Sequence, residues 1–439
     1  MRPATDRTAR FQLLLIKPPH YDDDGYVIQW FRSAIPSNTL AALYGLVALV
    51  GVQSNQFPRA MDIARQLRAA GIQVAIGGSH VSGCFSMLPG IQPESQEALD
   101  LGISLYAGEA TGRLDEMLLD AAAGALKPIY NYMDDLPGLE GQPAPMLPPE
   151  RIARTGGRLT SFDAGRGCPF QCSFCTIINV QGRKSRYRTA DDVEALIRRN
   201  LAQGVDHFFI TDDNFARNRN WEPIFDQLIE MKERENLFFR FVTQVDTLCH
   251  KIPNFVEKAA RAGVIRVFIG IENINPENLL AAKKKQNRIS EYREMLLAWK
   301  AVGCFTYAGY ILGFTADTTE TILRDIKIIQ RELPLDLLEF FFLTPLPRSE
   351  DHKKLYTAGV VINPDLNNYD LEHACTAHPK MSKAEWEQAY QLAWKAYYTP
   401  EHMETIMRRA VATRISPGKM MFLLLWFWGC VTLEHVHPL

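Results

Sequence analysis

The sequence has little of several things, and each shortage narrows the class of protein. Its 439 residues include only 8 cysteines, and its net charge is −2 with a pI of about 6.6. This charge balance offers no strongly basic surface for nucleic acid. Most of the cysteines are scattered without the spacing of a disulfide framework, and the N-terminus has no apolar core typical of a signal peptide. We therefore expect a cytoplasmic protein with no nucleic-acid partner.

Long hydrophobic runs are also scarce. The longest candidate, MMFLLLWFWGCVTL at 420–433, falls short of the roughly 20 apolar residues that a spanning helix needs. We expect a buried core helix there. The alternative is an interfacial helix that makes peripheral membrane contact and reaches a lipid-like substrate.

The N-terminal part alternates strand and helix signals, which predicts a parallel, doubly wound Rossmann or flavodoxin-like domain over residues 1–126. The expected strands are 13–19, 47–54, 73–83 and 103–110, and the expected helices include 37–46 and 57–71. Helix 37–46 runs into strand 47–54 without turn residues, although such connections usually take several residues. This junction suggests that one strand–helix unit is missing.

Residues 127–158 follow as a proline-rich linker, because 127–149 alone contains six prolines. Beyond it, about six strand–helix pairs predict a partial (β/α)6 barrel of the TIM type over 159–350, and 351–439 reads as a helical C-terminal region. The expected strands are 159–165, 207–213, 239–246, 266–273, 304–313 and 337–347, and the expected helices are 190–203, 221–235, 252–262, 290–302 and 319–332. In such barrels the chemistry lies at the C-terminal ends of the strands.

Three of the cysteines, Cys168, Cys172 and Cys175, lie together in GRGCPFQCSFC directly after the first barrel strand. Structural zinc takes four ligands, and although His207 or Cys249 could supply the fourth, neither shows paired zinc spacing. Iron–sulfur clusters also usually take four thiolates. Three thiolates would leave one iron open to a small molecule.

The C-x3-C-x2-C spacing, with an aromatic residue before the last cysteine and a six-unit barrel around it, resembles the radical S-adenosylmethionine (radical SAM) enzymes. The resemblance implies that Cys168, Cys172 and Cys175 hold a [4Fe–4S] cluster whose open iron binds SAM. An electron from a donor such as flavodoxin or ferredoxin would then give a 5′-deoxyadenosyl radical that abstracts hydrogen from the substrate.

The same resemblance implies SAM-binding roles for residues at successive strand ends. These are Phe174, Asp213, Gln244, Glu272 in a G-x-E motif, and Leu312 in ILGF. For Asp212 and Asp213 the alternative is a solvated turn or a helix cap, and for ILGF it is simple core packing.

Two further segments are less clear. RKSRYR at 183–188 is by default a solvated basic face, although Arg186 or Arg188 could meet the SAM carboxylate or an anionic substrate. TPLPRSE at 344–350 resembles the family's T-P-x-P-G-T turn, but it has Arg348 where glycine is usual.

A doubly wound domain ahead of the barrel resembles the cobalamin-dependent subclass. The matching residues are Ser54 in VQSNQF, and Gly77, Gly78 and His80 in IGGSH, where glycines let the backbone approach a ligand closely. The D-x-H-x-x-G motif is absent, so the resemblance implies cobalt without a histidine ligand from the protein. The alternative is a plain flavodoxin-like helper domain.

The resemblance thus implies a methyltransferase that carries out cobalamin-dependent C-methylation of an unactivated carbon. The aromatic segments AYYTP and WFWG point to a hydrophobic, lipid-like or polycyclic small molecule as substrate. One alternative is cyclisation, rearrangement or carbon–carbon coupling without methyl transfer. A more distant alternative is a non-catalytic zinc-binding protein.

Overall fold

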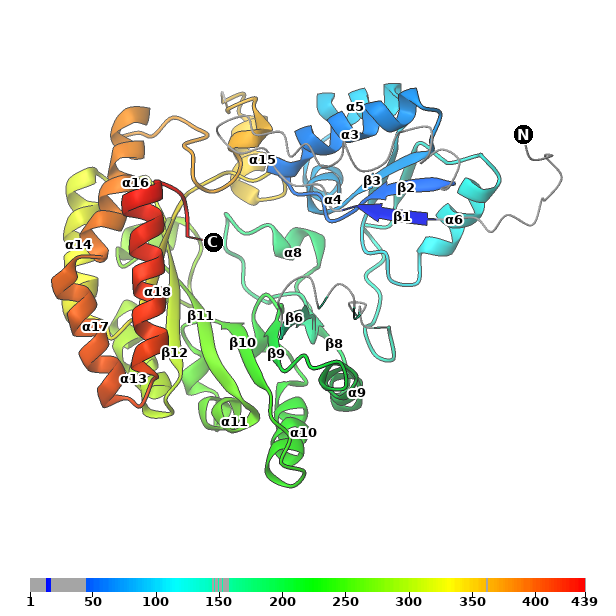
Figure 1. The fold of residues 1–439 in the computed structure, drawn as a ribbon. Helices are drawn as coiled ribbons and strands as arrows, with labels where there is room; N and C mark the ends of the chain where they lie inside the picture. The colour runs from blue at the N-terminus through cyan, green and yellow to red at the C-terminus, as the bar shows by residue number, and fades with distance from the viewer. Residues whose placement is uncertain are drawn as a thin grey trace. The chain divides into compact units, whose positions relative to one another are not determined.

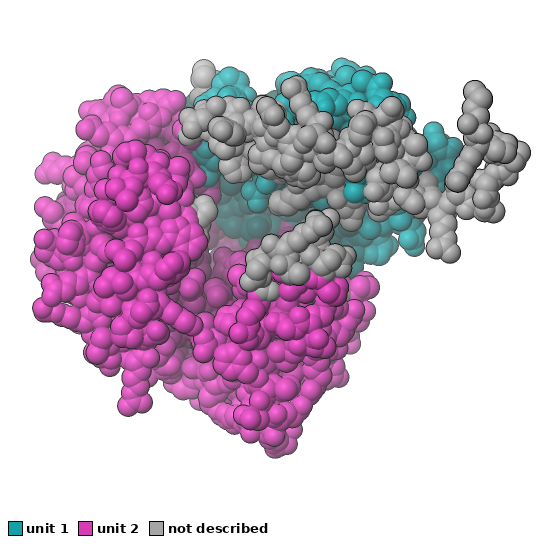
Figure 2. Space-filling model, viewed as in Figure 1, with its two compact units in different colours: residues 1–137, 174–180, 344–370 teal, residues 138–173, 181–343, 371–439 magenta. Residues whose placement is uncertain are grey.

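A computed structural model describes residues 13–16, 45–143, 146, 149, 152, 158–360 and 362–438. The chain divides into two compact units (Figure 2). Unit 1 comprises residues 1–137, 174–180 and 344–370, and unit 2 comprises residues 138–173, 181–343 and 371–439. Two segments far along the sequence therefore fold with the N-terminal domain, a grouping that differs from the simple linear order expected from the sequence.

Unit 1 is built on a parallel sheet with the strand order β1-β2-β3-β4-β5 (Figure 1). Apolar residues from α3 and α5 pack on one face of the sheet, and those from α6 pack on the other. This arrangement confirms a parallel α/β fold with helices on both faces. The bounds are β1 Leu13–Ile16, β2 Leu46–Leu49, α3 Phe57–Ala69, β3 Val74–Gly77, α4 Ser79–Met87, α5 Pro93–Asp100, β4 Ser104–Ala107, α6 Leu114–Ala122 and β5 Ile129–Asn131.

Three details of unit 1 differ from the expectations. Leu46 begins strand β2 instead of ending a helix, and Gly45 before it is a bend. Residues 37–44 of the expected helix lie outside the described residues. Strand β2 stops at Leu49, because Ser54–Gln56 forms a 3-10 helix, η1, with a capping box. Part of the expected linker, Ile129–Asn131, pairs with β4 as an edge strand. An edge position suits a strand that directly follows a proline.

Unit 2 contains the predicted barrel. Its six strands are all parallel, in the order β13-β12-β11-β10-β9-β6. The strands are β6 Leu159–Phe162, β9 His207–Ile210, β10 Arg240–Val245, β11 Val264–Glu272, β12 Phe305–Leu312 and β13 Leu337–Phe342. The helices between them are α9 Ala190–Leu201, α10 Trp221–Glu233, α11 Phe255–Ala262, α13 Tyr292–Ala301 and α14 Thr319–Glu332. The six expected strands and the five expected helices between them are confirmed.

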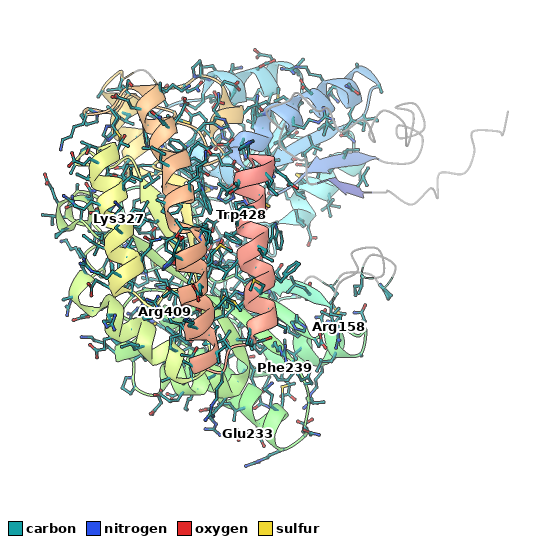
Figure 3. The ribbon with its side chains drawn as sticks, turned by 60° about the vertical axis from the view of Figure 1, so that its left-hand side comes forward. Arg158, Glu233, Phe239, Lys327, Arg409 and Trp428 are labelled. Atoms are coloured by element: carbon teal, nitrogen blue, oxygen red, sulfur yellow. The ribbon has the colours of Figure 1, made fainter. Side chains whose placement is uncertain are left out.

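The C-terminal region is helical, as expected. Helix α15 (Glu350–Thr357) belongs to unit 1, whereas α16 (Lys383–Tyr397), α17 (Pro400–Ala412) and α18 (Pro417–Gly429) lie together beside the barrel (Figure 1). Arg409 of α17, labelled in Figure 3, donates to the carbonyls of Leu333 and Gln330 at 3.1 and 3.3 Å and so caps the end of α14.

The apolar run 420–433 forms most of α18 and a following π-turn, η6 (Cys430–Glu434). Only one face of α18 joins the core, so the expectation of a buried helix holds for half of it. Buried are Met420, Leu423, Leu424 and Phe427, and exposed are Met421, Phe422, Leu425 and Trp426. Among the described helices, none is long and apolar enough to cross a membrane.

Candidate active site

The loop after β6 is fixed by a buried carboxylate. Asp212 Oδ1 accepts hydrogen bonds from the backbone N–H groups of Ala164 and Gly165 at 2.8 and 2.7 Å, and Oδ2 accepts one from Asn218 at 2.8 Å. A Cβ at Gly165 would lie 2.5 Å from the Asn218 amide, so only glycine fits. Asp212 therefore positions the start of the cysteine loop.

Burial is the main influence on Asp212 and outweighs its hydrogen bonds. It raises the pKa of the Asp212 carboxyl to about 7, and the nearby charge of Asp163 raises it further. Asp212 is only 3% exposed. It is thus not a solvated turn residue, and its carboxylate is hydrogen-bonded to the start of the cysteine loop and to Asn218.

The cysteine loop is braced by the segment that follows helix α12 (Pro276–Ala281). Gln286 Nε2 donates to the Cys172 thiol at 3.3 Å, and Ser173 N–H donates to the carbonyl of Ala282 at 3.0 Å. Thr247 holds the backbone of Gln286 through a 3.1 Å hydrogen bond. Cys172 is buried, whereas Cys168 and Cys175 are half-buried, and none of the three forms a disulfide.

Cys168 and Cys172 lie in unit 2, and Cys175 and Phe174 belong to the segment 174–180 of unit 1. The pKa of the Cys168 thiol is raised, first by burial and then by the neighbouring Cys172 and Asp213, while a hydrogen bond with Asn214 opposes the shift. Asp213 therefore lies near Cys168 of the cysteine loop, and its predicted contact with SAM stays a prediction.

A second group of polar residues lies at the ends of β9 and β10. Asp246 accepts two hydrogen bonds from the Arg217 guanidinium, at 2.7 and 2.8 Å, and a third from Asn214 at 3.0 Å. The guanidinium also lies 5.4 Å from the Phe170 ring in the cysteine loop. The sequence reading missed Arg217, because an arginine in DDNFARN looks like a solvated turn until the fold brings it to Asp246.

Three predicted residues lie at the C-terminal ends of the adjacent strands β10, β11 and β12, namely Gln244, Glu272 and Leu312. The topology therefore brings them to one edge of the barrel. Gln244 Nε2 donates to the Asp212 carbonyl at 3.4 Å. The carbonyl of Leu312 accepts from Leu343 N–H at 2.9 Å.

Glu272 has an unusual backbone. Its φ is 62°, a conformation that non-glycine residues seldom adopt, and it lies at a register shift in β11. The largely buried Lys284 forms an ion pair with its carboxylate. Strain of this kind concentrates at functional sites, and the SAM contact of Glu272 stays a prediction. The sequence reading missed Lys284, together with Gln286, because KKKQN resembles a solvated charge run.

The structure answers different questions for the segments RKSRYR and TPLPRSE. Arg188 is buried and donates to the carbonyls of Asp163 and Gln142 at 2.8 and 2.6 Å. Its guanidinium is therefore used by the fold, which corrects the idea of a solvated residue. Arg348 has a φ of 146°, a region that favours glycine, so the family's usual glycine is explained by backbone geometry.

The predicted cofactor residues of unit 1 lie at the ends of β2 and β3. A Cβ at Gly78, whose φ is 149°, would lie 2.1 Å from the backbone nitrogen of Val52. This glycine therefore permits close approach of two backbone segments. Ser54 and His80 are both buried, and Ser54 Oγ lies 3.1 Å from His80 Nδ1. The structure brings all four predicted residues together, with Gly77 next to Gly78.

Comparison with known proteins gives a consistent result. Residues 163–329 match the Radical SAM superfamily. The chain is 24% identical to the hopanoid C-2 methylase of Rhodopseudomonas palustris (strain TIE-1), over 81% of this chain and 66% of that protein. It is 26% identical to the bacteriochlorophyllide d C-8(2)-methyltransferase of Chlorobaculum tepidum, over 74% of this chain and 72% of that protein.

Two solved structures share the fold. The radical SAM methyltransferase TsrM from Kitasatospora setae, with tryptophan and a SAM analogue bound, superposes with a TM-score of 0.63 at 16% identity, over 80% of this chain and 77% of that one. The cobalamin-dependent SAM radical enzyme OxsB, with aqua-cobalamin and SAM bound, superposes with a TM-score of 0.57 at 13% identity, over 96% of this chain and 75% of that one. The chain spans about two thirds of the length of the hopanoid methylase.

Proposed function

We propose that this chain, which belongs to the radical SAM superfamily, is a cobalamin-dependent enzyme that methylates an unactivated carbon of a hydrophobic, polycyclic small molecule. The carrying observation is the cysteine loop 168–175, which follows the first strand of a six-stranded parallel barrel in a chain that also contains a parallel α/β unit. Two similar proteins are named as a hopanoid C-2 methylase and a bacteriochlorophyllide d C-8(2)-methyltransferase.

The donor set fits an iron–sulfur cluster bound through Cys168, Cys172 and Cys175. All three are free of disulfides, and the amide of Gln286 donates to Cys172 as hydrogen-bond donors do around cluster sulfurs. When bound, the cluster supplies one-electron cleavage of SAM, with flavodoxin or ferredoxin as the proposed donor. The chain's own residues orient the thiols and exclude water around Cys172, which is 7% exposed.

For SAM, we propose contacts from the strand ends of the barrel. Asp213, Gln244, Glu272 and Leu312 follow or end β9, β10, β11 and β12, which are neighbours in the sheet. A carboxylate beside the cysteine loop suits the methionine ammonium, and Glu272, already held by Lys284, suits a hydroxyl group. Phe174 is proposed to pack near the adenine ring.

For cobalamin, we propose the carboxyl edge of the unit 1 sheet. Gly51, Gly78 and Gly108 follow β2, β3 and β4, and all three have positive φ. Ligands of open α/β sheets bind at this edge, where glycines let a ligand approach the backbone. Gly77 precedes Gly78 there. Ser54 and His80 support the edge from within, because His80 N–H also donates to the Val52 carbonyl at 3.0 Å.

The exposed face of α18 is apolar, and this supports the proposal that the substrate is hydrophobic. Phe422 and Trp426 are 64% and 44% exposed on a helix whose opposite face is buried. We propose that this face makes peripheral contact with a lipid surface, from which a hydrophobic substrate is taken up.

The test of the methylation proposal is product analysis. The full chain is purified without oxygen, reconstituted with iron, sulfide and cobalamin, and incubated with SAM and a panel of hopanoid and chlorin substrates. Methyl transfer with radical initiation yields a methylated product, S-adenosylhomocysteine and 5′-deoxyadenosine. Substrate turnover with 5′-deoxyadenosine and no S-adenosylhomocysteine would contradict methylation and favour cyclisation, rearrangement or coupling.

A further inference from the structure

Unit 1 contains a second group of metal-ligating side chains, away from the three-cysteine motif. His80 and Cys84 lie one turn apart on the same face of α4, and Glu94 lies in the first turn of α5. His80 Nε2 is 3.9 Å from Cys84 Sγ and 3.5 Å from Glu94 Oε1. One ligand atom from each residue lies within 4.8 Å of the other two.

These separations are close to those around a tetrahedral zinc ion. With zinc–sulfur bonds of about 2.3 Å and zinc–nitrogen or zinc–oxygen bonds of about 2.0 to 2.1 Å, the ligand atoms lie about 3.3 to 3.6 Å apart. The separations of His80 from Cys84 and from Glu94 exceed these values by only a few tenths of an ångström. A donor set of imidazole, thiolate and carboxylate is one that zinc accepts.

The orientation of His80 is fixed by its other ring nitrogen. Nδ1 is hydrogen-bonded to the buried Ser54 Oγ at 3.1 Å, which leaves Nε2 directed at Cys84 and Glu94. The Phe57 ring packs against the imidazole with a centroid distance of 4.5 Å. A polar partner on the far nitrogen together with an apolar wall is the usual support of a metal-binding histidine.

A candidate for the fourth ligand lies in the segment 344–370. His352 of α15 lines the same cavity of about 630 Å³ as Glu94. It is 6% exposed, and its Nδ1 has no hydrogen-bond partner among the described residues.

We propose that His80, Cys84 and Glu94, with His352 as fourth ligand, bind one divalent metal ion of the zinc class. The metal would join α4, α5 and α15, and so hold the segment 344–370 onto the unit 1 sheet. This site goes beyond the proposed methylation and does not depend on it. It assigns the His80 ring to the metal and leaves the strand-end glycines for a cofactor.

Metal content of a cluster-free chain tests the site. The full-length C168A/C172A/C175A variant lacks the radical SAM motif, so any metal it retains reports on another site. After loading with Zn²⁺ and removal of loosely bound ions, we expect one zinc per chain. Loading with Co²⁺ instead should give visible bands of tetrahedral cobalt and a near-ultraviolet thiolate-to-cobalt band.

Further variants on that background identify the ligands. Cys84→Ser should abolish the thiolate-to-cobalt band. Glu94→Gln and His352→Gln should each weaken zinc binding by at least about tenfold. The control is Cys430→Ser, a thiol outside the cluster, which should change neither the cobalt band nor the zinc affinity. Circular dichroism checks that each variant is folded. Less than a tenth of a zinc per chain in the cluster-free parent would overturn the proposal, and the group would then be a metal-free ion pair of His80 and Glu94. Unchanged zinc affinity in H352Q would overturn the assignment of the fourth ligand.

Discussion

The two units differ in how deeply they bury their reactive side chains. Unit 2 presents Cys168 half-buried at the mouth of the barrel, in a loop where three cysteines fall within eight residues. Unit 1 buries His80 completely, and its neighbours Cys84 and Glu94 come from two helices. A loop site with an open side suits exchange of a small molecule, whereas a site closed by several elements suits structural binding. The contrast separates the proposed site for chemistry from the proposed metal site for stability.

The largest effect that this contrast predicts is the loss of activity in Cys172→Ala. Removing one of the three proposed cluster ligands should lower SAM cleavage by at least about 10³-fold, because the proposed open-iron cluster would no longer assemble. Iron content and 5′-deoxyadenosine formation measure it. Cys84→Ser, the matched change in unit 1, should retain the iron. If both variants lost iron equally, the two sites would not be independent.

The interior of the barrel offers a pH-dependent test within unit 2. Burial raises the pKa of Glu339 to about 7, although the Tyr307 hydroxyl donates to its carboxylate, and Glu372 raises it further. His437 Nε2 lies 3.3 Å away. The ordinary value is near 4.5, so the folded chain holds this proton more tightly than the unfolded chain. The stabilisation is complete below the ordinary pKa and is lost as the pH rises through about 7.

Glu339→Gln should therefore flatten the pH dependence of stability. Between about pH 5 and about pH 8, the wild-type chain should lose up to about 3 kcal/mol of unfolding free energy relative to the variant. Denaturant unfolding of unit 2, followed at several pH values, measures the difference. A constant difference across this range would show that Glu339 is ionised in the folded barrel.

The positions of the site residues in the sequence decide how much of each site could be predicted. The barrel was predictable because strand and helix signals alternate regularly along residues 159–350, and the cysteine loop because its spacing is short and fixed. Arg217, Lys284 and Gln286 look like solvated polar residues until tertiary contacts bring them to Asp246, Glu272 and Cys172. His352 was out of reach because it lies far along the chain from His80, and only the folding of 344–370 into unit 1 connects them.

A smaller effect is predicted for Gln286→Leu. The amide donates to Cys172 Sγ, and such hydrogen bonds raise the reduction potential of a cluster. The variant should retain iron, have a more negative cluster potential and lose about tenfold in turnover. Redox titration followed by electron paramagnetic resonance measures the potential. Lys285→Ala, an exposed neighbour, is the control, and an unchanged potential in Gln286→Leu would show that the hydrogen bond has no influence on the cluster.

The smallest effect concerns the surface of unit 2, where the apolar face of α18 contrasts with single exposed apolar residues of unit 1. The double variant F422S/W426S removes two large apolar side chains, and it should lower partitioning onto phosphatidylcholine vesicles by about fivefold to tenfold. Figure 3 shows that Trp428 lies on the same helix. Leu119→Ser, at a 71% exposed position of α6, is the control and should leave flotation unchanged. Because Phe422 and Trp426 lie outside the core, the double variant should keep the unfolding free energy of the wild type. Equal flotation of the wild type, the double variant and the control would rule out lipid contact through α18.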